Sequence, residues 1–201
     1  MGKILIINGS PRAPKSNSKQ YAALFSKACS WESHYRDLTR ANHLELCHAA
    51  DEVSDVLFVF PLYADGIPVT LLNFLKTWEE YGSRQKPTVS VLINCGFLEA
   101  EQNNVAVKMM ELYCRENGLP FGSVLKIGGG EAILSTPFRI LVQAKIKKLA
   151  RAIVRQENRT FQVTMPLSKK MFLNASTSYW IRYGERHGIT REQMASMQIE
   201  P

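Results

Sequence analysis

Short apolar runs alternate with amphipathic segments along most of this chain. Apolar, β-branched or alternating runs predict strands at residues 3–8, 34–39, 55–60, 88–93 and 121–127. Apolar positions at helical spacing between and after them predict helices at 19–30, 68–81, 100–117 and 138–156, while residues 41–52 predict one or two helical turns at most. Strands that alternate with helices pair in parallel through right-handed crossovers. The pattern therefore predicts an α/β fold of three layers, with a five-stranded parallel sheet between helices.

The pattern changes in the last forty or so residues. From Pro166 on, apolar side chains such as Met171, Ala175, Tyr179 and Tyr183 recur at helical spacing, with basic side chains between them. We therefore expect a domain at 1–160 and a C-terminal helical extension at 161–201, packed on the same domain or on a dimer partner. A basic amphipathic helix can instead lie on a membrane, but the aromatic residues here are too few to favour that alternative.

Composition sets the class of protein. The chain has 201 residues, 45% of them hydrophobic and 21% charged, which is typical of one globular domain with a core. Its net charge of +7 favours anionic ligands, and a phosphorylated cofactor satisfies that preference. The basic residues are spread along the chain without interleaved aromatic residues, so no nucleic-acid partner is expected.

The cysteines and the first residues bear on metal binding and location. The four cysteines stand far apart and form no C-x-x-C pair, so no metal site is expected. His43 and His48 flank Glu45 and Cys47, but their irregular, polar segment favours ordinary surface residues. The apolar run at 4–7 is too short for a signal peptide, and no stretch has the length of a membrane span. We therefore expect a cytoplasmic protein with reduced thiols and no membrane partner.

The loop after the first predicted strand carries the strongest functional signal. Residues 9–18 break the strand and lead into a helix, whose first N–H groups and positive dipole end attract anions. Hydroxyl and amide donors lie along this loop, together with a guanidinium suited to phosphate oxygens: Ser10, Arg12, Ser16, Asn17 and Ser18. The alternative is that these residues only cap the helix.

Two better-known phosphate loops are excluded by their spacing. The loop contains no G-x-x-x-x-G-K-[ST] motif and no G-x-G-x-x-G motif, so neither a nucleoside triphosphate loop nor the usual dinucleotide fingerprint is present. A cradle of hydroxyls around a single terminal phosphate remains. Such a cradle suits a mononucleotide.

Two further loops follow buried strands at the same predicted edge of the sheet. Ligands of open α/β sheets bind at the carboxyl ends of the strands. The loop at 61–68 offers Tyr63 as a surface for a flat heteroaromatic ring and backbone N–H groups from Leu62 to Ala64 for its edge. The loop at 94–99 offers Asn94 as donor and acceptor, and Gly96 permits close backbone approach. Each loop alone is also compatible with a plain turn.

These motifs resemble one family. Ile7-Asn8-Gly9-Ser10-Pro11-Arg12, Ser16-Asn17-Ser18 and Pro61-Leu62-Tyr63 are similar in order and spacing to the NAD(P)H-dependent FMN reductases and flavodoxin-like quinone reductases. The resemblance covers residues 1 to about 130 and implies a flavodoxin-like sandwich with strand order 2-1-3-4-5, the order for which flavodoxin itself is the standard example. It also implies a homodimer. Some relatives carry a cysteine-rich insert that binds an iron–sulfur cluster, but residues 39–53 hold only Cys47.

The resemblance also implies roles for individual residues. Ser10, Arg12, Ser16, Asn17 and Ser18 would hold the FMN phosphate. The isoalloxazine ring would lie against a second set, Pro61, Leu62, Tyr63 and Ala64, and the other side of the ring or the ribityl chain against a third, Asn94, Gly96 and Phe97.

The expected activity follows from this cofactor. The implied enzyme transfers a hydride from NAD(P)H to FMN and then to a quinone-like or other small electron acceptor by a ping-pong mechanism, and the flavin carries the chemistry without a catalytic side chain. The alternatives are a flavodoxin-like FMN electron carrier and a non-catalytic flavin-binding module. Electron carriers tend to be acidic, whereas this chain is basic. The sequence selects neither the acceptor nor NADH over NADPH, and it does not separate a dimer from a tetramer.

Overall fold

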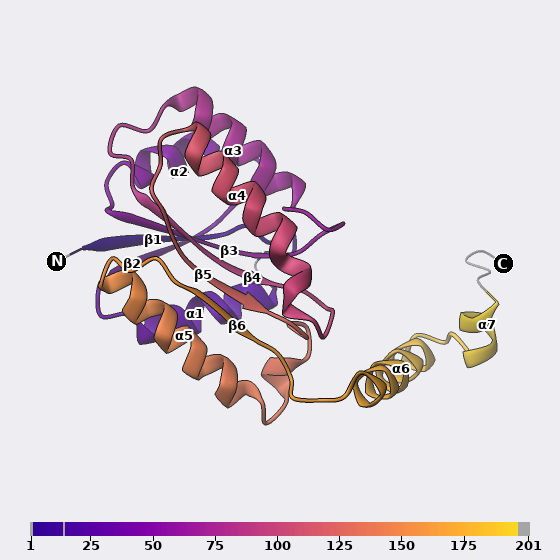
Figure 1. The fold of residues 1–201 in the computed structure, drawn as a ribbon. Coiled ribbons are helices and arrows are strands. Elements are labelled where there is room, and N and C mark those ends of the chain that lie inside the picture. Colours follow the sequence, from indigo (N-terminus) through magenta and orange to yellow (C-terminus); the bar gives the residue numbers. More distant parts are fainter. Residues whose placement is uncertain (1, 14, 197–201) are drawn as a thin grey trace. The chain divides into compact units, whose positions relative to one another are not determined.

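A parallel sheet forms the middle of the first of two compact units of the chain (Figure 1). The computed structural model describes residues 2–13 and 15–196. Six strands pair in the order β2-β1-β3-β4-β5-β6, and all five pairings are parallel. Their bounds are β1 (Lys3–Asn8), β2 (Glu32–Asp37), β3 (Asp55–Pro61), β4 (Thr88–Asn94), β5 (Phe121–Ile127) and β6 (Thr160–Val163).

Helices cover both faces of this sheet and make three layers (Figure 1). On one face α1 (Asn17–Ala28) contacts α5 (Arg139–Val154). On the other face lie α2 (His43–Ala50), α3 (Val69–Tyr81) and α4 (Asn104–Glu116). Two short 3-10 helices, η1 (Ala100–Asn103) and η2 (Ile133–Ser135), precede α4 and α5. The predicted α/β sandwich is therefore confirmed.

The central strands are buried on both faces, which explains their continuous apolar sequence. In β3, Val56, Phe58 and Phe60 belong to the core beneath α2, α3 and α4, whereas Leu57 and Val59 point to the opposite face and are also fully buried. Burying a side chain of this size contributes about 1.5–3 kcal/mol each. The sheet is therefore a rigid support for the loops at its carboxyl edge.

The expected number of strands is wrong, because β6 adds a sixth strand next to β5. Val124 pairs with Thr160 and Ile127 with Val163. The strand has four residues, only the last of which is buried, so it lacks the apolar run that marks the other strands. The expected boundary between residues 160 and 161 lies within this strand. The first compact unit ends at Met165.

Most predicted elements are present with shifted ends. Helix α1 begins at Asn17 rather than Lys19, because Ser16 caps it and accepts a hydrogen bond from the Lys19 N–H at 3.2 Å. The polar segment at 41–52 contains the full helix α2, which the sequence left open. Its apolar residues Leu46, Cys47 and Ala50 are buried.

In the second compact unit, Pro166–Pro201, the described residues up to 196 contain two helices. The predicted amphipathic helix is α6 (Lys169–Arg186), and a short helix not predicted from the sequence, α7 (Arg191–Ala195), follows it. Gly184 is the buried residue of α6, and a Cβ there would lie 2.6 Å from Met194 Sδ, so the two helices touch closely at this point. No helix in the described ranges is both long and apolar enough to cross a membrane.

Candidate functional site

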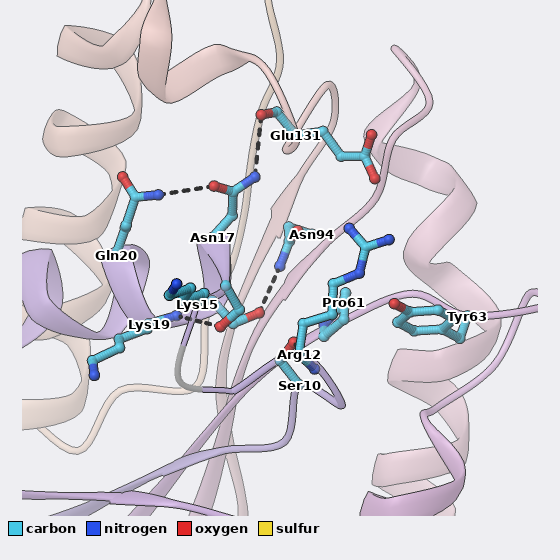
Figure 2. Close-up of a pocket in the computed structure, with 12 residues that line it drawn as sticks. Ser10, Arg12, Lys15, Asn17, Lys19, Gln20, Pro61, Tyr63, Asn94 and Glu131 are labelled. Atoms are coloured by element: carbon cyan, nitrogen blue, oxygen red, sulfur yellow. Dashed lines mark hydrogen bonds between the residues drawn. The ribbon is translucent and has the colours of Figure 1, made fainter. Parts of the chain in front are cut away.

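A cavity opens at the carboxyl edge of the sheet, where β1, β3 and β4 end (Figure 2). Its volume is about 470 Å³, which is within the usual range for a cofactor site. Twelve residues line it: Ser10, Arg12, Lys15, Ser16, Asn17, Ser18, Lys19, Gln20, Pro61, Tyr63, Asn94 and Glu131. The cavity therefore lies at the edge where an open α/β sheet binds its ligands.

One end of the cavity is formed by the β1–α1 loop and the first turn of α1. The first turn contains no acidic residue, so the positive end of the helix dipole is not neutralised there. The N–H groups of Asn17 and Ser18 are at the start of the helix and have no acceptor within it. This end of the cavity therefore suits an anion.

The three serine hydroxyls at this end accept hydrogen bonds from the protein. Ser10 Oγ accepts from the Arg12 N–H at 3.3 Å, and Ser18 Oγ accepts from Asn94 Nδ2 at 3.3 Å. Ser16 Oγ accepts from the Lys19 N–H. Because a hydroxyl also carries one proton, each of these side chains retains a donor for an acceptor in the cavity.

Asn8, at the end of β1, supports this loop from beneath. Its Oδ1 accepts from the Ser10 N–H at 3.1 Å, and its Nδ2 lies 2.9 Å from Asp37 Oδ1 and 3.0 Å from the Tyr35 hydroxyl. Tyr35 also donates to Asp37. Burial, together with the hydrogen bond to this carboxylate, raises the pKa of Tyr35. This polar network fixes the path of the loop, and Asn8 is a positioning residue that the predicted site did not include.

Positive charge also lines the cavity. Lys15 and Lys19 lie at this end, whereas the guanidinium of Arg12 points toward the side that Tyr63 borders (Figure 2). None of the three forms an ion pair with a carboxylate within residues 2–13 and 15–196. Unpaired cations beside three hydroxyl donors and a helix N-terminus form an arrangement that suits phosphate.

The loop after β3 folds back as a tight turn beside the cavity. Tyr63 and Gly66 exchange backbone hydrogen bonds of 3.1 and 2.9 Å, with Ala64 at φ 44° and Asp65 at φ 58°. The expected use of N–H groups from Leu62 to Ala64 is wrong for two of them. Leu62 N–H donates to Asn94 O at 2.7 Å and Tyr63 N–H to Gly66 O, so neither remains for a ligand.

Asn94 joins three elements at the floor of the cavity. Its Nδ2 donates to Ser18 Oγ and, at 3.2 Å, to the Phe60 carbonyl. Both amide protons are therefore engaged, and only Oδ1 is left as an acceptor, whereas the sequence predicted a donor as well. Gly130 approaches so closely that a Cβ there would lie 2.7 Å from Asn94 Cβ.

Asn17 uses its side chain to hold a neighbouring loop. Nδ2 donates to the carbonyls of Gly130 and Glu131 at 3.2 and 3.1 Å, and Oδ1 accepts from Gln20 at 2.9 Å (Figure 2). Its amide is thus committed to the protein. Asn17 reaches an anion in the cavity only through its backbone N–H.

The structure brings together eight of the twelve predicted site residues. Those that line the cavity are Ser10, Arg12, Ser16, Asn17, Ser18, Pro61, Tyr63 and Asn94. Four do not line it: Leu62, Ala64, Gly96 and Phe97. Leu62 is held by its hydrogen bond to Asn94, Ala64 belongs to the folded-back turn, and the Phe97 side chain is 53% exposed.

Four lining residues were missed. Lys15 and Lys19 lie close to Ser16 in the sequence, so their positions could have marked them as site residues. Gln20 lies one turn into the helix. Glu131 follows the glycines at 128–130, and nothing in the sequence marked it as a site residue. Its backbone reaches the cavity through the bond from Asn17.

Cys95, although next to the site, is not placed as a nucleophile. Its Sγ contacts the carbonyls of Phe97 and Glu99 at 3.7 Å each, and burial raises the pKa of its thiol. No group of three metal-ligating side chains occurs within the described ranges. The lining residues offer hydrogen-bond donors and charges, and no nucleophile–base pair occurs among them.

Comparison with known proteins gives a likeness in fold. No protein-family model matches the chain, and no curated protein matches it. Among solved structures, the NAD(P)H:quinone oxidoreductase from Methanothermobacter marburgensis matches with a TM-score of 0.61 and 16% identity, over 76% of this chain and 97% of that chain. An NADPH-quinone reductase from P. pentosaceus matches with a TM-score of 0.58 and 13% identity, over 75% and 98%.

A flavodoxin gives a third match. The Streptococcus pneumonia TIGR4 flavodoxin has a TM-score of 0.57 and 12% identity, over 76% of this chain and 98% of that chain. At these identities the likeness establishes the arrangement of the elements. The chain therefore has a flavodoxin-like α/β fold, which the resemblance in its motifs predicted, with six parallel strands in place of five.

Proposed function

We propose that this chain is an FMN-dependent oxidoreductase, which takes a hydride from NAD(P)H and passes it to a quinone-like or other small acceptor by a ping-pong mechanism. The observation that carries the proposal is the end of the cavity at α1. There three serine hydroxyls with a proton to donate, two unpaired cations (Lys15 and Lys19) and a helix N-terminus surround one space, and Arg12 lines the same cavity. A phosphomonoester supplies the acceptor oxygens and the negative charge that such a space requires.

Each part of the cavity has a role in this proposal. Ser10, Arg12, Ser16 and Ser18 would bind the phosphate, with Asn17 contributing its backbone N–H. Tyr63 and Pro61 would border the ring, and the other predicted contacts of the ring, Leu62, Ala64, Gly96 and Phe97, stay predictions. FMN would supply the hydride transfer chemistry, so the side chains only need to bind the cofactor and leave one face of its ring accessible.

The named neighbours support a reductase more than an electron carrier, although a flavodoxin is among them. Two of the three matches above are called quinone reductases or oxidoreductases. The charge of +7 also favours a protein that attracts the phosphates of NAD(P)H. A flavodoxin-like carrier remains the rival, because it would use the same cradle.

An absorption spectrum of the purified protein tests the proposal. After incubation with FMN and removal of excess, the protein is expected to show flavin bands between about 300 and 550 nm that bleach when NADH or NADPH is added without oxygen. Adding a quinone should restore the bands. Bands that persist with both nicotinamides indicate an electron carrier, and no bands at all rule out the flavoprotein.

The expected homodimer and cytoplasmic location stay predictions. The described part of α6 exposes apolar side chains, among them Met171, Tyr179 and Tyr183, and a second copy would give them cover. Light scattering coupled to size-exclusion chromatography measures the mass directly. A mass near 45 kDa, twice the 22.7 kDa of one chain, would support the dimer.

A further inference from the structure

Glu131 is the single acidic residue among the described residues that line the cavity. Its carboxylate forms no ion pair or hydrogen bond within the described ranges, unlike a carboxylate that only stabilises the fold. A negative charge in a cavity suited to phosphate opposes the binding of anions. The place of this charge in the cavity therefore needs an explanation.

The backbone around Glu131 is held from several sides. The Gly130 N–H donates to Cys95 O at 2.7 Å, and the Gly130 carbonyl accepts from the Tyr21 hydroxyl at 2.7 Å. Asn17 donates to the carbonyls of both Gly130 and Glu131. The loop therefore presents the Glu131 side chain to the cavity from a fixed position.

The carboxylate lies at the end of the cavity that is proposed for the ring. A Cβ built on Gly96 would be 3.7 Å from Glu131 Cδ and 3.9 Å from its Oε2, so the carboxylate lies over the loop after β4. Figure 2 shows its side chain extending toward the side of the cavity that Arg12 and Tyr63 border. Lys15 and Lys19, by contrast, belong to the β1–α1 loop and the start of α1.

The balance of charges changes once a phosphate is present. Three cations line the cavity, and a phosphomonoester carries about two negative charges at neutral pH, so about one positive charge is left. Glu131 cancels this remaining charge. Without it, the space above the ring would attract anions.

We propose that Glu131 determines the charge class of the electron acceptor, so that the site favours uncharged or cationic acceptors over anionic ones. The inference rests on the proposed function, since it concerns the substrate that occupies the same site. The reaction is the same for either class: two electrons and one proton arrive as a hydride, and water supplies the second proton of the hydroquinone. A difference in rate between acceptors of similar shape then reflects their charge.

The test compares 1,4-naphthoquinone with its 2-sulfonate on the FMN-loaded protein, using Glu131→Gln and the control Glu99→Gln. Glu99 is an exposed carboxylate of the neighbouring loop that does not line the cavity. Glu131→Gln is expected to raise kcat/KM for the sulfonate relative to the uncharged quinone by about three- to tenfold at low salt, and the ratio should return toward the wild-type value as salt is added. The control should leave the ratio unchanged.

Binding gives a second readout that does not depend on turnover. The dissociation constants of both quinones for the oxidised, FMN-loaded protein, measured by fluorescence quenching, should shift in the same sense as the rates. If reduction of FMN by NAD(P)H is intact but Glu131→Gln changes the ratio no more than Glu99→Gln does, the inference is wrong and the proposed function stands. If neither nicotinamide reduces the flavin, or no FMN binds, the proposed function fails and the inference with it.

Discussion

Gly130 allows the loop after β5 to approach the floor of the cavity closely. Replacing it with a larger residue should therefore destabilise the fold and disturb the site. A Cβ at this position would lie 2.7 Å from Asn94 Cβ, 3.1 Å from Asn94 Oδ1 and 3.2 Å from Cys95 O. Contacts that short force the atoms apart, and overpacking of this kind typically costs about 1–3 kcal/mol. Gly130→Ala is therefore expected to lower the free energy of unfolding by that amount. For a domain of this size the melting temperature would fall by about 2–4 °C per kcal/mol.

The same displacement should reach the binding site. Asn94 holds Ser18 and the end of β3 through its two amide hydrogen bonds, so a shift of Asn94 moves one of the three hydroxyl donors. We expect FMN to bind about tenfold more weakly, which corresponds to the loss of about one hydrogen bond to a charged group. Thermal unfolding followed by circular dichroism measures the first effect, and quenching of flavin fluorescence measures the second.

Gly96→Ala is the matched control, because it adds the same methyl group to the neighbouring loop. Its Cβ would approach no atom more closely than the 3.7 Å to Glu131 Cδ, which is ordinary van der Waals contact. It should leave the melting temperature within about 1–2 °C of wild type. Equal effects of the two substitutions, or no effect of Gly130→Ala, would refute the argument from close approach.

Four further substitutions test other parts of the structure. Ala64→Gly should raise the free energy of unfolding by about 1 kcal/mol, since Ala64 holds a left-handed conformation at φ 44°. Gly82→Ala, at φ 68°, should lower the free energy of unfolding for the same reason. Urea titration would show a higher midpoint for the first variant and a lower midpoint for the second. Ser16→Ala should lower the stability by about 1 kcal/mol through the lost helix cap and weaken FMN binding, measurable by calorimetry; weakened stability with unchanged FMN affinity would leave Ser16 as a cap alone. Burial raises the pKa of the Asp55 carboxyl, so the folded state favours its protonated form, and the stability that this form provides is lost as pH rises through the raised pKa. Asp55→Asn should therefore raise the melting temperature at pH 7, with the difference shrinking as pH falls toward about 4, and a constant difference at all pH values would contradict this reasoning.

The sequence predicted the central layers well because the strands there are buried on both faces. After Asp55, β3 is a continuous apolar run, and β4 is apolar apart from Thr88, Ser90 and Asn94; few other structures suit such runs between helices. β6 has no such signal, because an edge strand with one buried residue in four gains its pairing from β5 rather than from its own sequence. Helix α2 also gave only a weak signal in the sequence, because only three of its side chains are buried and the rest of the segment is mostly polar.

The site divides along a similar line. Residues of the β1–α1 loop and the first turn of α1 are close in sequence as well as in space, so Ser10, Ser16 and Ser18 could be identified from their spacing. Glu131 is 113 residues from Ser18 in sequence and reaches the cavity only through the packing of α1 against the loop after β5. The hydrogen bonding of backbone groups could not be predicted either. The turn at 63–66 uses N–H groups for its own hydrogen bonds, whereas an open loop would have left them free for a ligand.

Amides and hydroxyls do different work in this site, and the difference decides what the cavity can bind. The amide of Asn17 donates its protons to the loop after β5, and the amide of Asn94 donates its protons to α1 and β3, so these two residues hold the walls of the cavity together. A serine oxygen that accepts from the protein still has a proton to give, so the hydroxyls point a set of donors at the same space. A ligand rich in acceptor oxygens and negative charge satisfies those donors and the nearby cations together. A ligand that only donates at that end, such as an amine, would leave all three hydroxyl protons without an acceptor, and an uncharged sugar would leave the nearby cations without a counter-charge. Both mismatches favour a phosphate at the α1 end of the cavity.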